Sequence, residues 1–178
     1  MKIYDCFMYF DEEVVVDVRL HTLNEFVDYF VIVESRFTHK GESRELKFDH
    51  KKFEKFKDKI IYIIDEEAYP QTQEIQTENS EDEKSIKLIF NAAYRENGQR
   101  NLLLKGLKEA NDEDLILISD VDEIPKLNNL NFKNINEKII LFKQDMFYYK
   151  FNLWLPNLIW TGTKACRRKN LISPQWLR

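Results

Sequence analysis

The sequence predicts an α/β sandwich built around a mostly parallel central sheet. Apolar runs of strand length, rich in β-branched residues, recur at 3–8, 29–35, 59–65 and 115–119, and helical or polar stretches separate them. Strands that alternate with helices are typical of parallel sheets. A chain of 178 residues fits one ordinary domain, so we expect a single domain over residues 1–178.

The first strand is expected over Ile3–Met8, because this run is short, apolar and followed by polar residues. Asp11 is a plausible N-cap for a helix over residues 12–26. The apolar positions near helical spacing in that stretch are Val14, Val15, Val18 and Leu23. The chain therefore begins with a strand and a helix.

Two further buried strands are expected at 29–35 and 59–65, with a short helix over 50–59 between them. Residues 66–84 are polar and lack periodicity, which predicts a surface segment. Ser80 and Glu83 have the spacing of a capping box.

The capping box opens a helical stretch over residues 84–110, within which Gly98 is an expected break. The strand at 115–119 follows it. The last elements that the pattern predicts are strands over 138–144 and 146–155.

Composition excludes several classes of protein. Hydrophobic residues make up 43% of the chain and charged residues 33%, as in soluble globular proteins. A net charge of −4 gives no general attraction to nucleic acid or anionic lipid. Cys6 and Cys166 lack the spacing of a zinc site or a disulfide framework. No run resembles a signal peptide or a membrane span, so we expect a cytoplasmic location.

The stretch "LILISDVDEIP" ends an apolar strand in three carboxylates, Asp120, Asp122 and Glu123. In an extended backbone the first two would project to one side, with Glu123 turned away. Two such carboxylates repel by roughly 2 to 3 kcal/mol at an effective dielectric near 20. A divalent metal, Mg²⁺ or Mn²⁺, would remove this repulsion and leave coordination positions for phosphate oxygens.

Three other interpretations of this turn stay open. The carboxylates can form a plain solvated turn, since short motifs often match by chance. An apolar strand ending in Asp-x-Asp also begins the haloacid-dehalogenase-like phosphatases, in which Asp120 would be the nucleophile and Asp122 the acid or base. A carbohydrate-binding domain without catalysis would explain the aromatic stretch "MFYYKFNLWLPNLIW".

Several blocks taken together resemble glycosyltransferase family 17, the β-1,4-N-acetylglucosaminyltransferases that add the bisecting GlcNAc to glycoproteins. The blocks are "YDCF", "VIVES", "KIIYIID", "ENGQRNLLLKGL", "DLILISDVDEIP" and "QDMFYYKFN", in this order. The resemblance implies a GT-A fold, UDP-GlcNAc as the sugar donor, dependence on Mn²⁺ or Mg²⁺, and inversion at the anomeric carbon.

The resemblance also implies roles for residues of the acidic turn and the strand ends. Asp122 would be the direct metal ligand, and Asp120 would contact the ribose or metal-bound water in the same metal site. Cys6, Phe7 and Glu34 would line the nucleoside pocket, although Cys6 and Phe7 are of types that usually lie in the core.

The resemblance places Arg100 and Asn101 in "GQRN" where related folds have a polar pair near the diphosphate, and a guanidinium suits phosphate geometry. A surface ion pair is the alternative for Arg100. Lys40 and Arg44 are weaker candidates for the same charge. Glu123 and Asp145 are the candidates for the general base that takes the proton of the acceptor hydroxyl.

Aromatic side chains near the site could stack on sugar rings, although at strand spacing they can equally be packing residues. They are Tyr148, Tyr149, Trp154 and Trp160. The expected partners are thus a nucleotide-sugar donor and a glycan or glycolipid acceptor.

The sequence differs from the family pattern in two respects. It begins almost directly at its first strand, without the Golgi anchor of animal members, which favours a cytoplasmic enzyme, peripheral at most at the inner face of the membrane. It ends at "SPQWLR", where family members continue with a segment rich in Gly, Trp and His, so we expect a C-terminal truncation. The histidines are His21, His39 and His50, and all are expected to be packing or surface residues.

Overall fold

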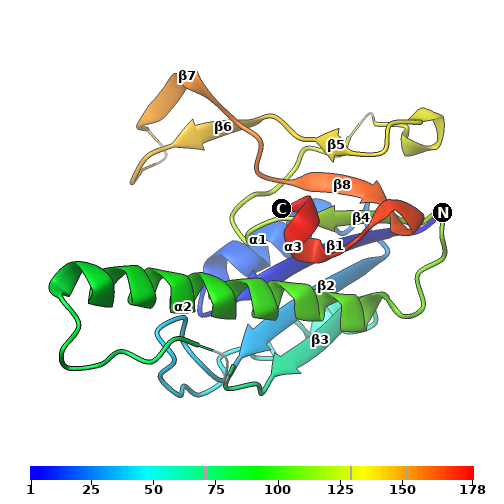
Figure 1. Ribbon diagram of the computed structural model, residues 1–178. Helices are drawn as coiled ribbons and strands as arrows, with labels where there is room; N and C mark the ends of the chain where they lie inside the picture. Colours follow the sequence, from blue (N-terminus) through cyan, green and yellow to red (C-terminus); the bar gives the residue numbers. More distant parts are fainter. Residues whose placement is uncertain (70–71, 129, 151) are drawn as a thin grey trace.

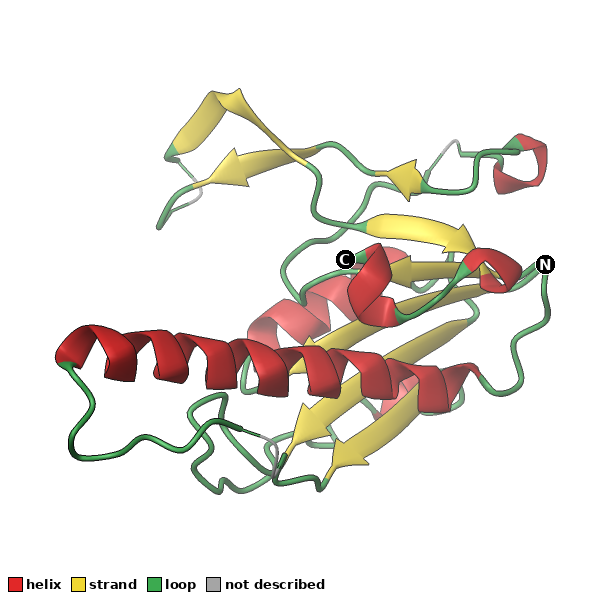
Figure 2. Cartoon of the chain, in the orientation of Figure 1, coloured by secondary structure: helices red, strands yellow, loops and turns green. Residues whose placement is uncertain are grey.

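The computed structural model describes residues 1–69, 72–128, 130–150 and 152–178. This part of the chain forms a six-stranded sheet with the strand order β3-β2-β1-β4-β8-β5, and a two-stranded sheet of β6 and β7 (Figures 1 and 2). Helices lie against the large sheet, so the predicted α/β class and the mostly parallel sheet are confirmed. The predicted strand over 146–155 and the predicted surface segment over 66–84 fall partly outside the described residues.

The parallel half of the sheet consists of the four strands that were predicted. They are β1 (Ile3–Tyr9), β2 (Tyr29–Ser35), β3 (Ile60–Asp65) and β4 (Leu115–Ile118). β1 lies at the centre and pairs in parallel with both β2 and β4. Apolar side chains fill both faces of these strands, because helices cover the sheet on both sides.

Two helices cover opposite faces of the sheet, with α1 (Glu13–Leu23) behind it and α2 (Glu81–Asn101) in front of it in Figure 1. Neighbouring residues of β1 point to opposite faces of the sheet, so the apolar core lies on both sides of it. Phe7 packs with the residues of α1, whereas Cys6 packs with Leu103 and Leu107 in the 3₁₀ helix that follows α2. Each face of β1 therefore has its own apolar cluster.

The buried face of α1 differs from the predicted one. Val14 and Val18 are exposed. The residues that face the sheet are Val16, Arg19, Leu20 and Leu23. Asp11 does not cap the helix, because the N-cap is Glu12 and no side chain caps this end. The prediction did not find this buried face of the helix because one of its four residues is an arginine, which is not an apolar residue.

The capping box at the start of α2 is confirmed: the Ser80 hydroxyl accepts a hydrogen bond from the amide of Glu83, and the Glu83 carboxylate accepts one from the amide of Ser80. Gly98 does not break the helix. Its missing side chain instead makes room for the ring of Tyr69, because a Cβ at this position would lie 2.1 Å from Tyr69 Cε1. The helix ends at Asn101 and continues as a 3₁₀ helix, whereas the prediction extended it to residue 110.

The remaining strands are β5 (Ile140–Leu141), β6 (Gln144–Phe147), β7 (Trp154–Trp160) and β8 (Lys164–Arg167). The prediction missed β8, which enters the large sheet antiparallel to β4 and β5. It also placed β7 too early in the chain. β6 and β7 form a hairpin that extends away from the large sheet in Figure 1.

Short helices complete the fold. They are the 3₁₀ helices Glu54–Phe56, Leu102–Leu107, Phe132–Asn134 and Arg168–Asn170, and the α-helix α3 (Pro174–Leu177). The first of these replaces the helix expected over residues 50–59. None of the helices in the described ranges has the length and hydropathy that crossing a bilayer requires.

Replacing Gly98 with Ala tests the contact with Tyr69. An alanine normally favours an interior helix position by about 1 kcal/mol, but the overlap with the ring should reverse the sign and lower the free energy of unfolding by about 1 to 3 kcal/mol. Urea denaturation measures the change. In a Tyr69→Ala background the same substitution should be neutral or stabilising, and destabilisation there as well would contradict the explanation.

Candidate functional site

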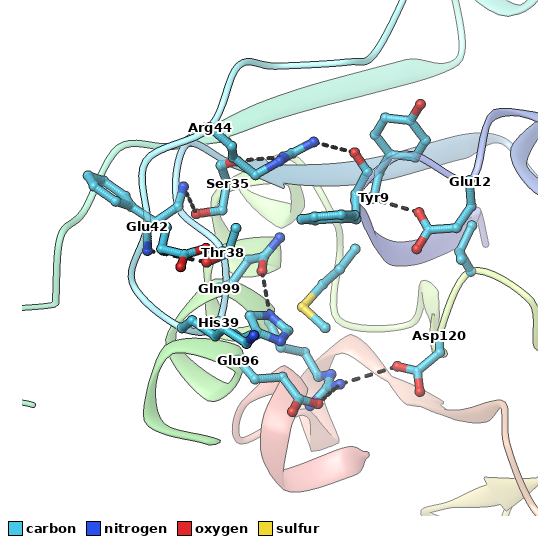
Figure 3. Close-up of a pocket in the computed structure, with 16 residues that line it drawn as sticks. Tyr9, Glu12, Ser35, Thr38, His39, Glu42, Arg44, Glu96, Gln99 and Asp120 are labelled. Carbon is cyan, nitrogen blue, oxygen red and sulfur yellow. Dashed lines mark hydrogen bonds and ion pairs between the residues drawn. The ribbon is translucent and has the colours of Figure 1, made fainter. Parts of the chain in front are cut away.

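A cavity of about 660 Å³ opens at the carboxyl ends of β1, β2 and β4 (Figure 3). Tyr9 and Phe10 line it at the end of β1, Ser35 at the end of β2, and Asp120 just after β4. The strand order places β2 and β3 on one side of β1 and β4 on the other, so the cavity lies at a topological switch point. Ligand sites of open α/β sheets form at this position, and cavities of roughly 300 to 1,000 Å³ hold small ligands.

The loop between β2 and β3 forms one wall of the cavity and is tied to α2, which forms another. The ring of His39 and the side chain of Gln99 share a hydrogen bond of 3.2 Å. Arg95 donates a hydrogen bond of 3.0 Å to the carbonyl of His39. Gly41 adopts a φ of 94°, and its missing Cβ leaves space for the Arg95 guanidinium. These contacts hold His39 in place, and it lines the cavity.

Glu34 supports the same loop from beneath. Its fully buried carboxylate accepts hydrogen bonds from the amides of Lys47 and Phe48 at 2.6 and 3.0 Å, and from the Tyr62 hydroxyl at 2.7 Å. Arg44 pairs with it at 3.0 Å and lies over the ring of Phe10, 4.2 Å from the ring centroid. The carboxylate thus holds the loop and does not line the cavity.

The carboxylates of the acidic turn do not converge as predicted. Asp122 is exposed. Glu123 is buried, and its carboxylate accepts a hydrogen bond of 2.9 Å from the amide of Asp120. Arg178 bridges the two, at 2.7 Å from Asp120 and 2.8 Å from Glu123. The expectation that Asp120 and Asp122 face one point with Glu123 turned away is therefore wrong, because the chain turns directly after β4 and does not stay extended.

Arginines balance the charge of Asp120. Arg100 contacts its carboxylate at 3.2 Å and also pairs with Glu96 at 2.6 Å. Burial alone would raise the pKa of Asp120, but the hydrogen bond and charge of Arg178, together with those of Arg100, lower that pKa below its usual value. Two guanidinium groups thus face the carboxylate for which the sequence analysis predicted a metal.

A metal held by Asp120 and Asp122 together does not fit this arrangement. Both oxygens of Asp120 contact guanidinium groups. No group of three or more His, Cys, Asp or Glu side chains in the described part of the chain is placed to bind a metal ion. Asp122 on its own would give Mg²⁺ or Mn²⁺ a single protein carboxylate.

Arg19 lies beneath the acidic turn, where the sequence analysis placed no site residue. It is fully buried and forms a two-point ion pair with Asp5, at 2.7 and 2.6 Å. Its guanidinium also donates 3.1 Å hydrogen bonds to the backbone carbonyls of Asp120, Val121 and Glu123. An arginine in an otherwise apolar helix stripe is the sequence signal that could have revealed it.

The β6–β7 hairpin is attached to the turn at its base. The indole N–H of Trp160 donates a 2.8 Å hydrogen bond to the Glu123 carboxylate. Gly162 packs so closely that a Cβ there would lie 2.5 Å from both Glu123 and Gln144. Since the side chain of Gln144 points toward this junction, strand alternation turns Asp145, which is exposed, to the other face.

The aromatic side chains proposed for sugar stacking all lie on this hairpin. Tyr148, Tyr149, Trp154 and Trp160 are each exposed. The hairpin therefore presents aromatic surface beside the turn.

Several residues expected at the nucleoside or diphosphate site lie elsewhere. Cys6 and Phe7 are fully buried core residues, and burial raises the pKa of the Cys6 thiol well above its usual value. They do not line the cavity, because β1 continues to Tyr9 and its last residues form that wall. Asn101 accepts a hydrogen bond from the amide of Gln175 and so anchors α3.

Arg100, Lys40 and Arg44 line the cavity, and their place beside a diphosphate stays a prediction. The prediction missed other lining residues, among them Tyr9, Phe10, His39, Glu96 and Gln99. Their positions depend on where β1 ends and on how α2 packs, and neither is visible in local sequence.

A cavity at the switch point of an α/β sheet defines an α/β protein with a small-ligand site at the carboxyl ends of its strands. A family model described as glycosyltransferase family 17 matches residues 1–170. The chain belongs to glycosyltransferase family 17. This membership leaves the phosphatase alternative without support.

Curated relatives share the same family. The chain is 30% identical over 121 residues to the human and rat proteins named β-1,4-mannosyl-glycoprotein 4-β-N-acetylglucosaminyltransferase, and 29% identical to the mouse protein. The match covers 66% of this chain and 20% of each relative. No solved structure matches the chain, and the GT-A assignment stays a prediction.

Replacing Asp120 with Asn tests the charge balance of the turn. A carboxylate whose folded-state pKa is lowered stabilises the fold above its unfolded pKa, near 4, and this contribution is lost as pH falls through the folded pKa. Because the side chain is 41% exposed, the loss at pH 7 should be on the order of 1 kcal/mol or less. Urea denaturation at pH 7 and pH 3 should show the difference from the unchanged protein shrinking in acid.

The control is Asp122→Asn, which removes an exposed carboxylate for which the described residues show no ion pair. Its effect should be near zero at both pH values. An equal effect of the two substitutions would refute the assignment.

Proposed function

We propose that this chain binds UDP-GlcNAc in the cavity and transfers GlcNAc to a hydroxyl of a glycan or glycolipid acceptor, with inversion at the anomeric carbon. The observation that carries the proposal is the position of the cavity: in a family 17 chain, it joins the ends of β1, β2 and β4 and ends on the acidic turn. The names of the relatives support the choice of sugar and suggest a mannosyl residue in the acceptor.

The nucleoside end of the donor is assigned to Phe10 and Phe37. Both line the cavity, and Phe10 is 45% exposed. The Arg44 guanidinium lies over the ring of Phe10 and holds it in place. A planar uracil can stack on such an aromatic surface, which takes over the role that the sequence analysis gave to Cys6 and Phe7.

The diphosphate is assigned to Arg100, which lines the cavity and contacts Glu96 and Asp120, both labelled in Figure 3. The Nε of this arginine is buried and has no hydrogen-bond partner in the described structure. A diphosphate can compete with Glu96, which is 39% exposed, for the guanidinium. The transferred sugar would then lie beyond Asp120, toward Glu123 and the hairpin.

The chemistry is a direct displacement at the anomeric carbon. The acceptor oxygen attacks as the bond to the diphosphate breaks, and a base takes the acceptor proton on the opposite face. Arg100 stabilises negative charge on the departing diphosphate. Glu123, within the turn, and Asp145, exposed on β6, remain the predicted bases. Because Asp120 and Asp122 do not form a joint metal site, no step is routed through a metal.

Replacing Arg100 with Gln tests the diphosphate assignment. Loss of a charge-assisted hydrogen bond to phosphate should weaken UDP binding by about tenfold to a hundredfold, and should leave the much weaker binding of uridine unchanged. Isothermal titration calorimetry measures both ligands, once with Mn²⁺ and once with a chelator, which tests the metal dependence that the resemblance implies. Arg168→Gln, outside the cavity, is the matched control.

Equal losses for UDP and uridine would show that the substitution damaged the cavity as a whole. Absence of UDP binding to the unchanged protein under both conditions would overturn the donor assignment. An assay for transfer of GlcNAc to a mannosyl acceptor, with the product detected by mass spectrometry, tests the reaction itself.

A further inference from the structure

The guanidinium of Arg19 gathers the backbone of the acidic turn around one point. Its Nη1 lies 3.1 Å from each of the carbonyl oxygens of Asp120, Val121 and Glu123, which share its two N–H groups, and its Nη2 donates to the Ser119 hydroxyl at 2.5 Å. One side chain thus holds four residues of the segment 119–123. With their carbonyls turned inward, the side chains of Asp120 and Glu123 reach Arg178 on the other side.

The guanidinium itself is held rigidly. Asp5 binds it at two points from the middle of β1, and the ring of Phe7 lies beneath it, 4.7 Å from the ring centroid to the guanidinium carbon. Arg19 and Asp5 are both fully buried. Because the planar fork of arginine presents five N–H donors in fixed directions, no other side chain can satisfy this set of acceptors.

We propose that Arg19 is a positioning residue for donor binding. It does not line the cavity. It acts through the backbone of residues 120–123, which places the Asp120 carboxylate at the end of the cavity and beside Arg100. The inference rests on the proposed function, because UDP is the ligand whose binding reports the position of the turn.

A positioning role and a structural role lead to different results. A buried ion pair can usually be replaced by apolar residues of similar volume without loss of stability. The double variant Asp5→Leu/Arg19→Met makes this replacement and leaves no buried charge. It cannot replace the hydrogen bonds to the three turn carbonyls, so the turn loses its support while the core stays filled.

The experiment measures the Tm and the UDP dissociation constant of the double variant. We expect a lower Tm, because the three turn carbonyls lose their donor, together with UDP binding weaker by about tenfold or more. The matched control is Leu20→Ala, in the next position of α1 and equally buried. It should lower the Tm and leave UDP binding within about twofold, since it opens a core cavity without removing a hydrogen bond to the turn.

Unchanged UDP affinity in a folded double variant would overturn the proposal. If the double variant does not fold, Arg19→Lys replaces it, because a lysine keeps the charge beside Asp5 but has too few donors for the turn. Its UDP affinity should then fall below that of Leu20→Ala, and native affinity in Arg19→Lys would equally overturn the proposal.

Hydrogen exchange separates this proposal from the donor assignment. The amides of Asp120, Glu123 and Ile124 are hydrogen-bonded within the turn. Their exchange should accelerate in the Arg19 variants and not in Leu20→Ala, whether or not UDP binds. Slow exchange in the variants would refute the positioning role even if UDP binding fails for another reason.

Discussion

The buried ion pair between Arg19 and Asp5 is the interaction on which the candidate site depends. It joins α1 and the strand β1 that precedes it to the turn after β4, which lies 102 residues further along the chain, at one fully buried point. Each backbone carbonyl that Arg19 satisfies would otherwise cost about 1 to 3 kcal/mol if it stayed buried without a partner. The turn consequently has its shape before any ligand arrives.

Above this support, the site is a network of opposite charges in near balance. Arg100 and Arg178 face Glu96, Asp120 and Glu123, and each carboxylate has at least one guanidinium within 3.2 Å. A diphosphate that enters this network exchanges partners with side chains already in place. Although the protein has a net charge of −4, positive charge is therefore present locally. It is paired with carboxylates until a stronger anion competes for it.

The sequence was sufficient to predict the parallel strands, the capping box at Ser80 and the location of the acidic turn, because these depend on local patterns. It was insufficient for β8 and for the direction of the turn carboxylates, which depend on long-range pairing with β4 and on Arg19. Arg100, which the resemblance singled out, lines the cavity. Phe10 was missed because the inference stopped at Cys6 and Phe7, before the strand ends.

The junction at the base of the β6–β7 hairpin is closed by its own hydrogen bonds. The amide of Phe142 bonds to the carbonyl of Thr163, and the amide of Thr163 bonds to the side chain of Gln144. The large sheet is thus complete without residues 145–160. Under the proposed function, acceptor preference would vary in that segment while the nucleotide site stays unchanged.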